Sequence, residues 1–162
     1  MAAVAAHEVA AAWAGPAASR LSVKWPNDLL ADGVKLTGIL LEREGDAVVI
    51  GIGVNLAEAP KLPDRPTIAL AHLGVAPDPA VFLEDLAQSL ARWIARWRGE
   101  GLAPVRTAWL TAAHPIGTAL SAAVGEERVE GLFDGLDEDG ALRLRRADGA
   151  TLTIRAGDVF LT

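Results

Sequence analysis

The sequence contains no cysteine, which excludes disulfide bonds and metal sites built on thiolates. A cysteine-free chain is consistent with the cytoplasm, where disulfides are rare. The chain also lacks any block of lysine and arginine, and its formal net charge is −6. Because phosphate binding needs a basic face, nucleic acid is a poor candidate for the main partner.

Long apolar runs are missing as well. No run reaches the roughly 18 apolar residues that a membrane-spanning helix needs. Met1 to Ala14 is rich in alanine, but His7 and Glu8 interrupt it and it carries no basic n-region, so we expect no signal peptide. We predict a cytoplasmic protein without a membrane partner. Its 162 residues are enough to bury a core without disulfides.

The first third of the chain predicts one helix followed by strands. Alanines favour a helix over 2–14, and Gly15-Pro16 ends it. The segment 47–54 is almost continuously apolar, which is typical of a central strand. Glu44-Gly45-Asp46 can close a hairpin before it. The predicted strands are 21–24, 35–41 and 47–54.

The middle third predicts a proline-containing loop and two helices. The loop covers 55–66, and Asp78-Pro79 begins a helix that runs to about residue 98. A shorter helix covers roughly 102–112. Apolar residues recur at three- and four-residue spacing along the first helix and predict one buried face. That face consists of Val81, Leu83, Leu86, Leu90, Trp93 and Trp97.

The pattern changes to short alternating segments from His114 onward. Turn signals at Gly125-Glu126, 137–140 and Asp148-Gly149 separate them, and strands at this spacing favour a small barrel. The predicted strands are 118–124, 127–133, 141–145, 151–154 and 158–161. We therefore predict an α+β fold: a mixed sheet with flanking helices in residues 1–114, then a small β-barrel in residues 115–162.

Candidate functional residues concentrate between Lys24 and Asn55. The stretch contains Lys24-Trp25-Pro26-Asn27-Asp28, then Lys35 to Glu42, then Gly51-Ile52-Gly53-Val54-Asn55. Lysine rarely enters a core unless it is paired. Glycine in a strand costs stability unless something approaches the backbone closely. Together these residues indicate a pocket for a flat, anionic ligand.

Each of these residues also has a purely structural explanation. Lys24 and Lys35 can be solvated strand ends, because most lysines are exposed. Asn27-Asp28 can be a turn pair, and the glycines can mark a bulge. Asn55 can cap a strand end. Only the joint order and spacing of the residues favour the functional interpretation.

That order resembles the biotin protein ligases. In this family Lys-Trp-Pro-Asn-Asp, Lys-Leu-x-Gly-Ile-Leu-x-Glu and Gly-x-Gly-x-Asn follow one another at this spacing, and the resemblance covers essentially the whole chain. It implies an SH3-like C-terminal domain. It implies ATP-dependent formation of biotinyl-5′-AMP and transfer of biotin to a lysine. The usual acceptor is the carrier domain of acetyl-CoA carboxylase, and a homodimer is compatible with the family.

The resemblance also assigns roles to individual residues. It implies that Lys35 contacts the biotin carboxylate and the adenylate phosphate, and that Asn55 holds the adenine. Asp28 lies beside the reacting centre, where it helps to place Mg²⁺ or the incoming amine. Lys24 and Trp25 are expected to support the loop. The implied catalytic residues are Lys35 and Asp28, and the implied binding residues for biotin and ATP are Lys35, Asn27, Gly38, Ile39, Leu40, Gly53 and Asn55.

One departure from the family pattern matters for activity. The family's Gly-Arg-Gly-Arg-x-Gly loop, which closes over biotin and the ATP phosphates, does not occur in the sequence. The sequence alone leaves a fragment, a late-assigned start and a remnant as explanations. Two rival functions stay open: a non-catalytic module that binds biotin or adenylate weakly, and a transferase of the lipoate ligase type.

Other possible site residues have simpler explanations. His7, His72 and His114 lack partners at metal-ligand spacing, and we expect His72 and His114 on helix surfaces. Trp93 and Trp97 are expected to pack against the core. The acidic group around 134–139 predicts a solvated turn, with docking of the acceptor protein as the alternative.

Overall fold

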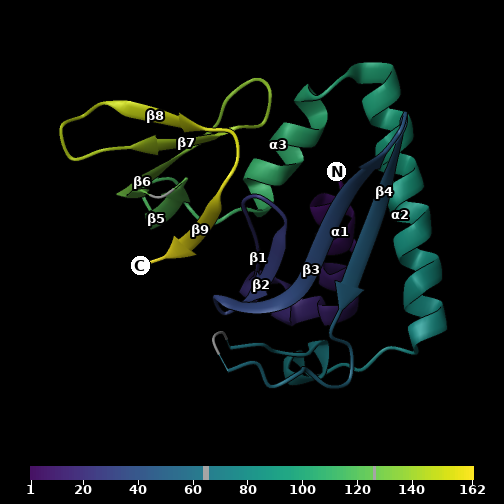
Figure 1. Cartoon of the computed structure of the whole chain (residues 1–162). Helices are drawn as coiled ribbons and strands as arrows, with labels where there is room; N and C mark the ends of the chain where they lie inside the picture. The colour runs from purple at the N-terminus through teal and green to yellow at the C-terminus, as the bar shows by residue number, and fades with distance from the viewer. Residues whose placement is uncertain (64–65, 126) are drawn as a thin grey trace.

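A computed structural model describes residues 1–63, 66–125 and 127–162 (Figure 1). These described residues form three α-helices and two antiparallel sheets, which confirms the predicted α+β class. Within the described residues, no helix is long and apolar enough to cross a bilayer. Residues 64–65 of the predicted loop, and Glu126 of the predicted turn, lie outside the described residues.

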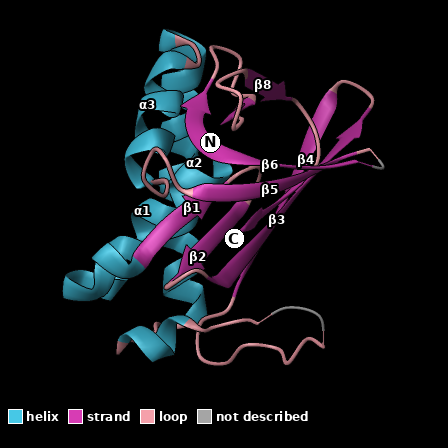
Figure 2. Ribbon diagram, turned by 90° about the vertical axis from the view of Figure 1, so that its left-hand side faces the viewer, coloured by secondary structure: helices cyan, strands magenta, loops and turns pink. Residues whose placement is uncertain are grey.

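The first sheet has four strands in the order β1-β2-β3-β4. All neighbouring strands run antiparallel. Among the described residues, parallel pairing is limited to the isolated bridges Val23 to Ala113 and Lys35 to Thr67. The mixed sheet that we predicted is therefore an antiparallel sheet with two parallel bridges. Helices cover one of its faces (Figure 2). The strands are β1 (Leu21–Lys24), β2 (Asp28–Ala31), β3 (Val34–Glu44) and β4 (Ala47–Val54).

The covered face begins with α1 (Ala2–Ala14), whose extent matches the prediction. Alanines let this helix lie close to the sheet, and Ala5 and Ala10 are fully buried. A 3-10 helix, η1 (Gly15–Arg20), leads from it into β1. Opposite α1, one cross-strand row of Val23, Leu29 and Thr37 is almost fully buried. This row forms the core of the N-terminal part.

Strand β2 was not predicted. It has only four residues and lies between two turn signals, so its pattern was too short to separate from the turns. All four residues are buried, because β2 lies between β1 and β3. The positive φ of 51° at Asp32 and 78° at Gly33 forms the tight turn that returns the chain into β3.

Strand β4 has the predicted bounds, but the prediction that it is central was wrong. It is the last strand in the sheet order, and the far half of the β3–β4 hairpin is open to solvent. Leu40 and Val48 are 59% and 60% exposed. Apolar side chains therefore occur on both faces of an edge hairpin, which is why the sequence pattern resembled that of a central strand.

Helix α2 (Pro79–Glu100) begins at Asp78, whose side chain accepts hydrogen bonds from two backbone amides of the first turn. Its buried face was predicted only in part: Leu86 is buried and Trp93 is half-buried. Trp93 donates a hydrogen bond to Glu8 of α1 at 2.8 Å. The expectation was wrong for three exposed residues of the helix, Val81, Leu83 and Trp97.

The second sheet has the order β8-β7-β6-β5-β9 and is antiparallel throughout. All five strands begin within a residue of the predicted bounds, and all but β6, which continues to Leu136, also end there. The closed barrel stays a prediction, and so does the division of the chain into domains at 114/115. The strands are β5 (Ala119–Val124), β6 (Glu127–Leu136), β7 (Leu142–Arg145), β8 (Thr151–Ile154) and β9 (Asp158–Leu161).

Helix α3 (Ala103–Ala112) packs against the second sheet through aromatic rings. Phe133 of β6 makes edge contacts with Trp109, at 6.2 Å between ring centroids, and with His114, at 4.5 Å. The expectation that His114 lies on a helix surface was therefore wrong. It follows α3 and is buried, and neither ring nitrogen has a hydrogen-bond partner among the described residues. Burial lowers the pKa of His114, and the positive charge of Lys24 lowers it further.

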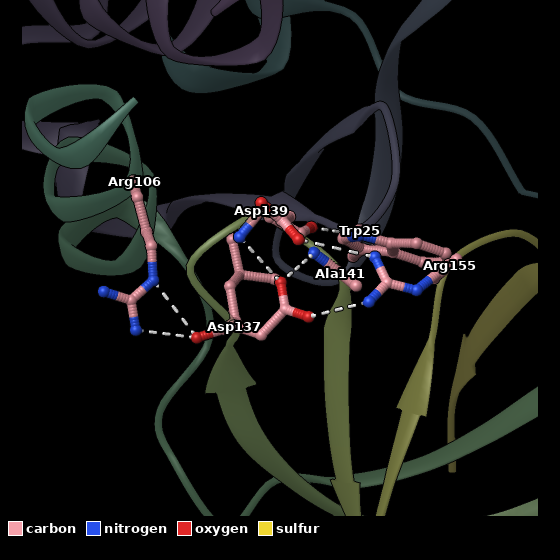
Figure 3. A network of polar contacts seen from close by, with 8 residues as sticks. Trp25, Arg106, Asp137, Asp139, Ala141 and Arg155 are labelled. Atoms are coloured by element: carbon pink, nitrogen blue, oxygen red, sulfur yellow. Dashed lines mark hydrogen bonds and ion pairs between the residues drawn. The ribbon is translucent and has the colours of Figure 1, made fainter. Parts of the chain in front are cut away.

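Polar side chains from the N-terminal part also reach a turn between β6 and β7 (Figure 3). Arg106 of α3 donates to the carbonyl of Leu136 at 2.7 Å, and Trp25 donates to the carbonyl of Gly140 at 3.2 Å. Asp137 holds the turn itself by accepting from the amides of Asp139 and Ala141. Asp137 and Asp139 of the acidic group thus lie in a hydrogen-bonded turn, whereas Asp134 belongs to β6 and accepts from Arg143 at 2.8 Å. Near it, Arg155 lies 3.8 Å from Asp137 and 3.7 Å from Asp139.

Candidate functional site

One row of residues crosses the whole first sheet. Lys24 of β1 pairs with Asp28 of β2, Asp28 with Gly38 of β3, and Gly38 with Gly53 of β4. Residues directly opposite each other in antiparallel strands point to the same face. We call this face, opposite to the row of Val23, Leu29 and Thr37, the open face. Two charged residues occupy one half of the row and two glycines occupy the other half.

Lys35 reaches the open face because of a bulge. In β2, Leu29 pairs with Thr37 of β3, and the next residue, Leu30, pairs with Lys35. Leu36 of β3 therefore has no partner in β2 and is the extra residue of the bulge. A bulge of this kind reverses the alternation of side chains along a strand. Lys35 therefore lies on the same side as Gly38. A Cβ at Gly38 would lie 3.6 Å from Cε and 3.8 Å from Nζ of Lys35, so the lysine side chain passes over this glycine.

Asp28 lies between two lysines. Its carboxylate accepts from the Lys35 ammonium at 2.5 Å and from the Lys24 ammonium at 3.0 Å, one oxygen for each. The side chains are 12% exposed for Asp28, 16% for Lys24 and 27% for Lys35. Two ammonium groups around one carboxylate leave the cluster with a formal charge of +1. Lys35 is the most exposed of the three, so its ammonium is the most accessible from solvent.

A cleft of about 620 Å³ opens at this cluster. Its volume lies within the range of small-molecule sites. Asn27, Asp28 and Lys35 line it, as does Lys24, so three of the predicted site residues share one cavity. Residues of β9 form the other wall: Asp158, Val159, Phe160 and Leu161. The sequence did not indicate this wall, because a short alternating strand carries no sign of which distant loop it will face.

The other predicted binding residues are not among the residues that line the cleft; they are Gly38, Ile39, Leu40, Gly53 and Asn55. Leu40 and Gly53 are on the open face. Leu40 lies two residues after Gly38 in β3, and Gly53 lies opposite Gly38 in β4. The side chain of Ile39 points to the opposite face and is buried in the core. Its carbonyl accepts a hydrogen bond from the Asn27 side chain, which ties the loop after β1 to β3.

Asn55 directly follows β4 and extends its pairing, since its amide donates to the Leu36 carbonyl at 3.1 Å. Its side chain donates to the carbonyl of Ile68 at 3.1 Å. This contact holds the segment after the proline loop against the end of the sheet. It uses one of the two N–H hydrogens of the amide, so the strand-end role and a ligand role are compatible.

The expected role of Asp28 in placing Mg²⁺ does not fit this arrangement. A magnesium ion needs oxygen ligands. Both carboxylate oxygens of Asp28 already accept from ammonium groups, and a divalent cation would lie beside two positive charges. We therefore assign no step to a metal held by this residue.

Family models match both ends of the chain. The model of the biotin/lipoate A/B protein ligase family matches residues 2–55, which include the whole row on the open face. The model of the biotin protein ligase C terminal domain matches residues 121–162, which include β9. Both walls of the cleft thus come from segments that match ligase models.

Curated relatives carry the same description. A biotin–[acetyl-CoA-carboxylase] ligase of Paracoccus denitrificans is 42% identical over 99% of this chain and 70% of the relative. A ligase of the same name from Mycobacterium tuberculosis is 37% identical over 85% of this chain and 52% of the relative. The bifunctional ligase/repressor BirA of Escherichia coli is 32% identical over 89% of this chain and 47% of the relative. The chain spans about half the length of the last two relatives.

Solved structures show the same fold. The apo biotin protein ligase of Aquifex aeolicus superposes with a TM-score of 0.82 over 98% of this chain and 73% of that protein, at 20% identity. The complex of that ligase with biotin and ATP superposes with a TM-score of 0.76 at 19% identity, over 98% of this chain and 72% of that one. Sequence identity to the Paracoccus relative and agreement of fold together lead to one conclusion: the chain belongs to the biotin protein ligase family.

Proposed function

We propose that this chain binds biotin and ATP, forms biotinyl-5′-AMP and transfers the biotinyl group to a lysine of a carrier protein. The acceptor that we propose is the carrier domain of acetyl-CoA carboxylase; the description of the Paracoccus relative names this carboxylase. We propose the cytoplasm as its compartment, in keeping with the absence of cysteine.

The observation that carries the proposal is the cluster of Lys24, Asp28 and Lys35 at the cleft. The first step joins two anions, the carboxylate of biotin and the α-phosphate of ATP. An ammonium about 4 Å from an anion stabilises it by up to about 4 kcal/mol at an effective dielectric constant near 20. The net charge of +1 on the cluster, fixed before the ligand arrives, is suited to that task.

Each step follows from this placement. In the first step, a carboxylate oxygen of biotin attacks the α-phosphorus, and the bond to pyrophosphate breaks. In the second step, the carrier amine attacks the acyl carbon, AMP leaves with the bonding electrons and the amine proton passes to solvent. Lys35 balances the negative charge in both steps. Gly38 and Gly53 leave the backbone of the open face bare, so a flat ligand can lie beside Lys35.

The C-terminal match supports biotin over lipoate as the substrate class. The N-terminal model covers both biotin and lipoate ligases, whereas the C-terminal model is described for biotin ligases only. Because β9 lines the cleft, the biotin-specific segment contributes directly to the candidate site.

A transfer assay tests the proposal. The chain is incubated with biotin, ATP and a carrier domain of acetyl-CoA carboxylase, and biotin on the carrier lysine is measured by mass spectrometry over time. The 162 residues contain no Gly-Arg-Gly-Arg stretch. Since loss of one positioned donor costs about 10²- to 10³-fold, we expect slow transfer that depends on ATP.

Two variants make the result specific. Lys35→Ala should abolish transfer with little change in melting temperature, because the lysine is partly exposed. Lys61→Ala, at an exposed lysine outside the cleft, should leave transfer unchanged. If the unmodified chain transfers no biotin, it is at most a binding module. If Lys35→Ala transfers biotin as fast as the unmodified chain, Lys35 has no role in the reaction. A joint loss of transfer and melting temperature would make Lys35 structural.

A further inference from the structure

Lys24 connects the two sheets of the molecule. Its ammonium donates to the carbonyl of Val159 in β9 at 2.8 Å and lies 3.0 Å from Asp28 in β2. Phe160, the next residue of β9, has its ring centroid 6.0 Å from the same ammonium. The side chain is only 16% exposed, so these contacts fix it in place.

Asp28 depends on this lysine. A carboxylate that is 12% exposed is costly to keep charged unless it is paired. With Lys24 present, one oxygen of Asp28 pairs with Lys24 and the other with Lys35, so Lys35 carries charge that Asp28 does not fully neutralise. Without Lys24, Asp28 and Lys35 would form a neutral pair, and an arriving anion would have to compete with Asp28 for Lys35.

We propose that Lys24 is a positioning residue that keeps Lys35 available to the anionic ligand by neutralising Asp28, and that the Val159 carbonyl of β9 holds it there. The proposal rests on the proposed function, since it concerns the site for the biotinyl adenylate. In this arrangement, the docking of β9 against the first sheet is part of ligand binding. The neighbouring Trp25 ties the same loop to the carbonyl of Gly140, so two consecutive side chains join the sheets.

The test compares two ligands in calorimetric titrations of the full chain. One is a sulfamoyl analogue of biotinyl adenylate, which carries a negative charge at the acyl linkage. The other is a biotin–adenosine conjugate with an uncharged linker at that position. Lys24→Met should weaken binding of the charged analogue at least tenfold, or about 1.4 kcal/mol. Binding of the uncharged conjugate should change less than about twofold, or roughly 0.4 kcal/mol.

A second substitution separates positioning from structure. Asp28→Asn removes the charge that Lys24 neutralises, so the double variant Lys24→Met with Asp28→Asn should bind the charged analogue nearly as well as the unmodified chain. Lys24→Arg should keep most of the affinity. Arg146→Met, which removes one positive charge from an exposed site away from the cleft, serves as the control for net charge.

The outcomes distinguish the two proposals. If the unmodified chain binds neither analogue, the proposed function fails. If it binds both and Lys24→Met does not discriminate between them, the role of Lys24 is overturned while the function stands. Equal weakening for both ligands, without recovery in the double variant, would make Lys24 a purely structural link between the sheets.

Discussion

Asn55 has a structural contact, and we propose that it also binds a ligand. Its side-chain amide donates to the carbonyl of Ile68, and the proposed ligand role needs a donor and an acceptor for adenine. Substitution of Asn55 by Asp replaces the donor with an anion. The change therefore affects the contact with Ile68 and the proposed adenine contact at the same time.

We predict that Asn55→Asp weakens ATP binding at least tenfold, which corresponds to about 1.4 kcal/mol. Biotin binding should change by less than about twofold, or roughly 0.4 kcal/mol. The lost hydrogen bond should also lower the free energy of unfolding by about 1 kcal/mol. Titration with each ligand and denaturant unfolding measure the two effects separately. ATP affinity within about twofold of the unmodified chain would leave Asn55 as a strand-end cap only.

The residues of the site were more predictable than their geometry. The order of Lys24, Asp28, Lys35 and Asn55 along the sequence indicated an anion site. What the sequence could not show is that Leu36 is a bulge residue, which brings Lys35 to the side of Gly38. A bulge depends on the pairing of β2 with β3, and β2 was itself too short to recognise. The ion pairs of Asp28 with Lys24 and Lys35 were not predicted either, because they depend on the same strand pairing.

Among the elements, the β3–β4 hairpin combines a buried base with an exposed tip. Leu36 at the base is fully buried, while Val48 near the tip is 60% exposed. Hydrophobic stabilisation follows the area removed from water, so the two ends should respond differently to polar or smaller side chains.

We predict that Leu36→Ala lowers the free energy of unfolding by about 2–5 kcal/mol, because it leaves a cavity in the core. Val48→Thr, a change of similar shape at an exposed site, should lower it by less than about 0.5 kcal/mol. Urea denaturation followed by circular dichroism measures both values. A large loss for Val48→Thr would show that the hairpin tip is covered in solution.

Element bounds were predicted well where turn residues stand beside long segments. Gly15-Pro16 marks the end of α1, and Asp78-Pro79 marks the start of α2. The strands at 47–54, 151–154 and 158–161 have the predicted bounds. Partners of the elements were less predictable, because periodicity shows that a face is apolar but not what covers it. Accordingly, β4 is an edge strand and three apolar residues of α2 are exposed.

At the scale of the whole molecule, the buried His114 and the half-buried His7 couple stability to pH. Burial lowers the pKa of His114 at the junction of the two sheets and that of His7 in α1. In the unfolded chain the pKa of histidine is about 6.5. Below that pH the unfolded chain binds more protons than the folded one, so the free energy of unfolding falls as the pH falls through about 6.5 toward the lowered pKa values.

We predict a loss of up to roughly 1.4 kcal/mol per pH unit for each histidine in that window. Denaturant unfolding between about pH 7.5 and 5.5 measures the slope, with the unperturbed histidine pKa inside the range. His114→Leu removes one of the two groups and should make the slope shallower, while His7 still contributes. An unchanged slope in His114→Leu would show that His114 takes up a proton in the folded protein without cost.

We propose that the cluster of Lys24, Asp28 and Lys35 is the anion site for biotinyl adenylate. A crystal structure of the chain with biotinyl-5′-AMP would show whether the phosphate binds there. We predict that the phosphate lies on the open face over Gly38, within about 3.2 Å of Lys35 Nζ, while Asp28 keeps its contact with Lys24. A ligand bound outside the cleft, or a Lys35 that stays closed on Asp28 and out of reach of the phosphate, would contradict the account.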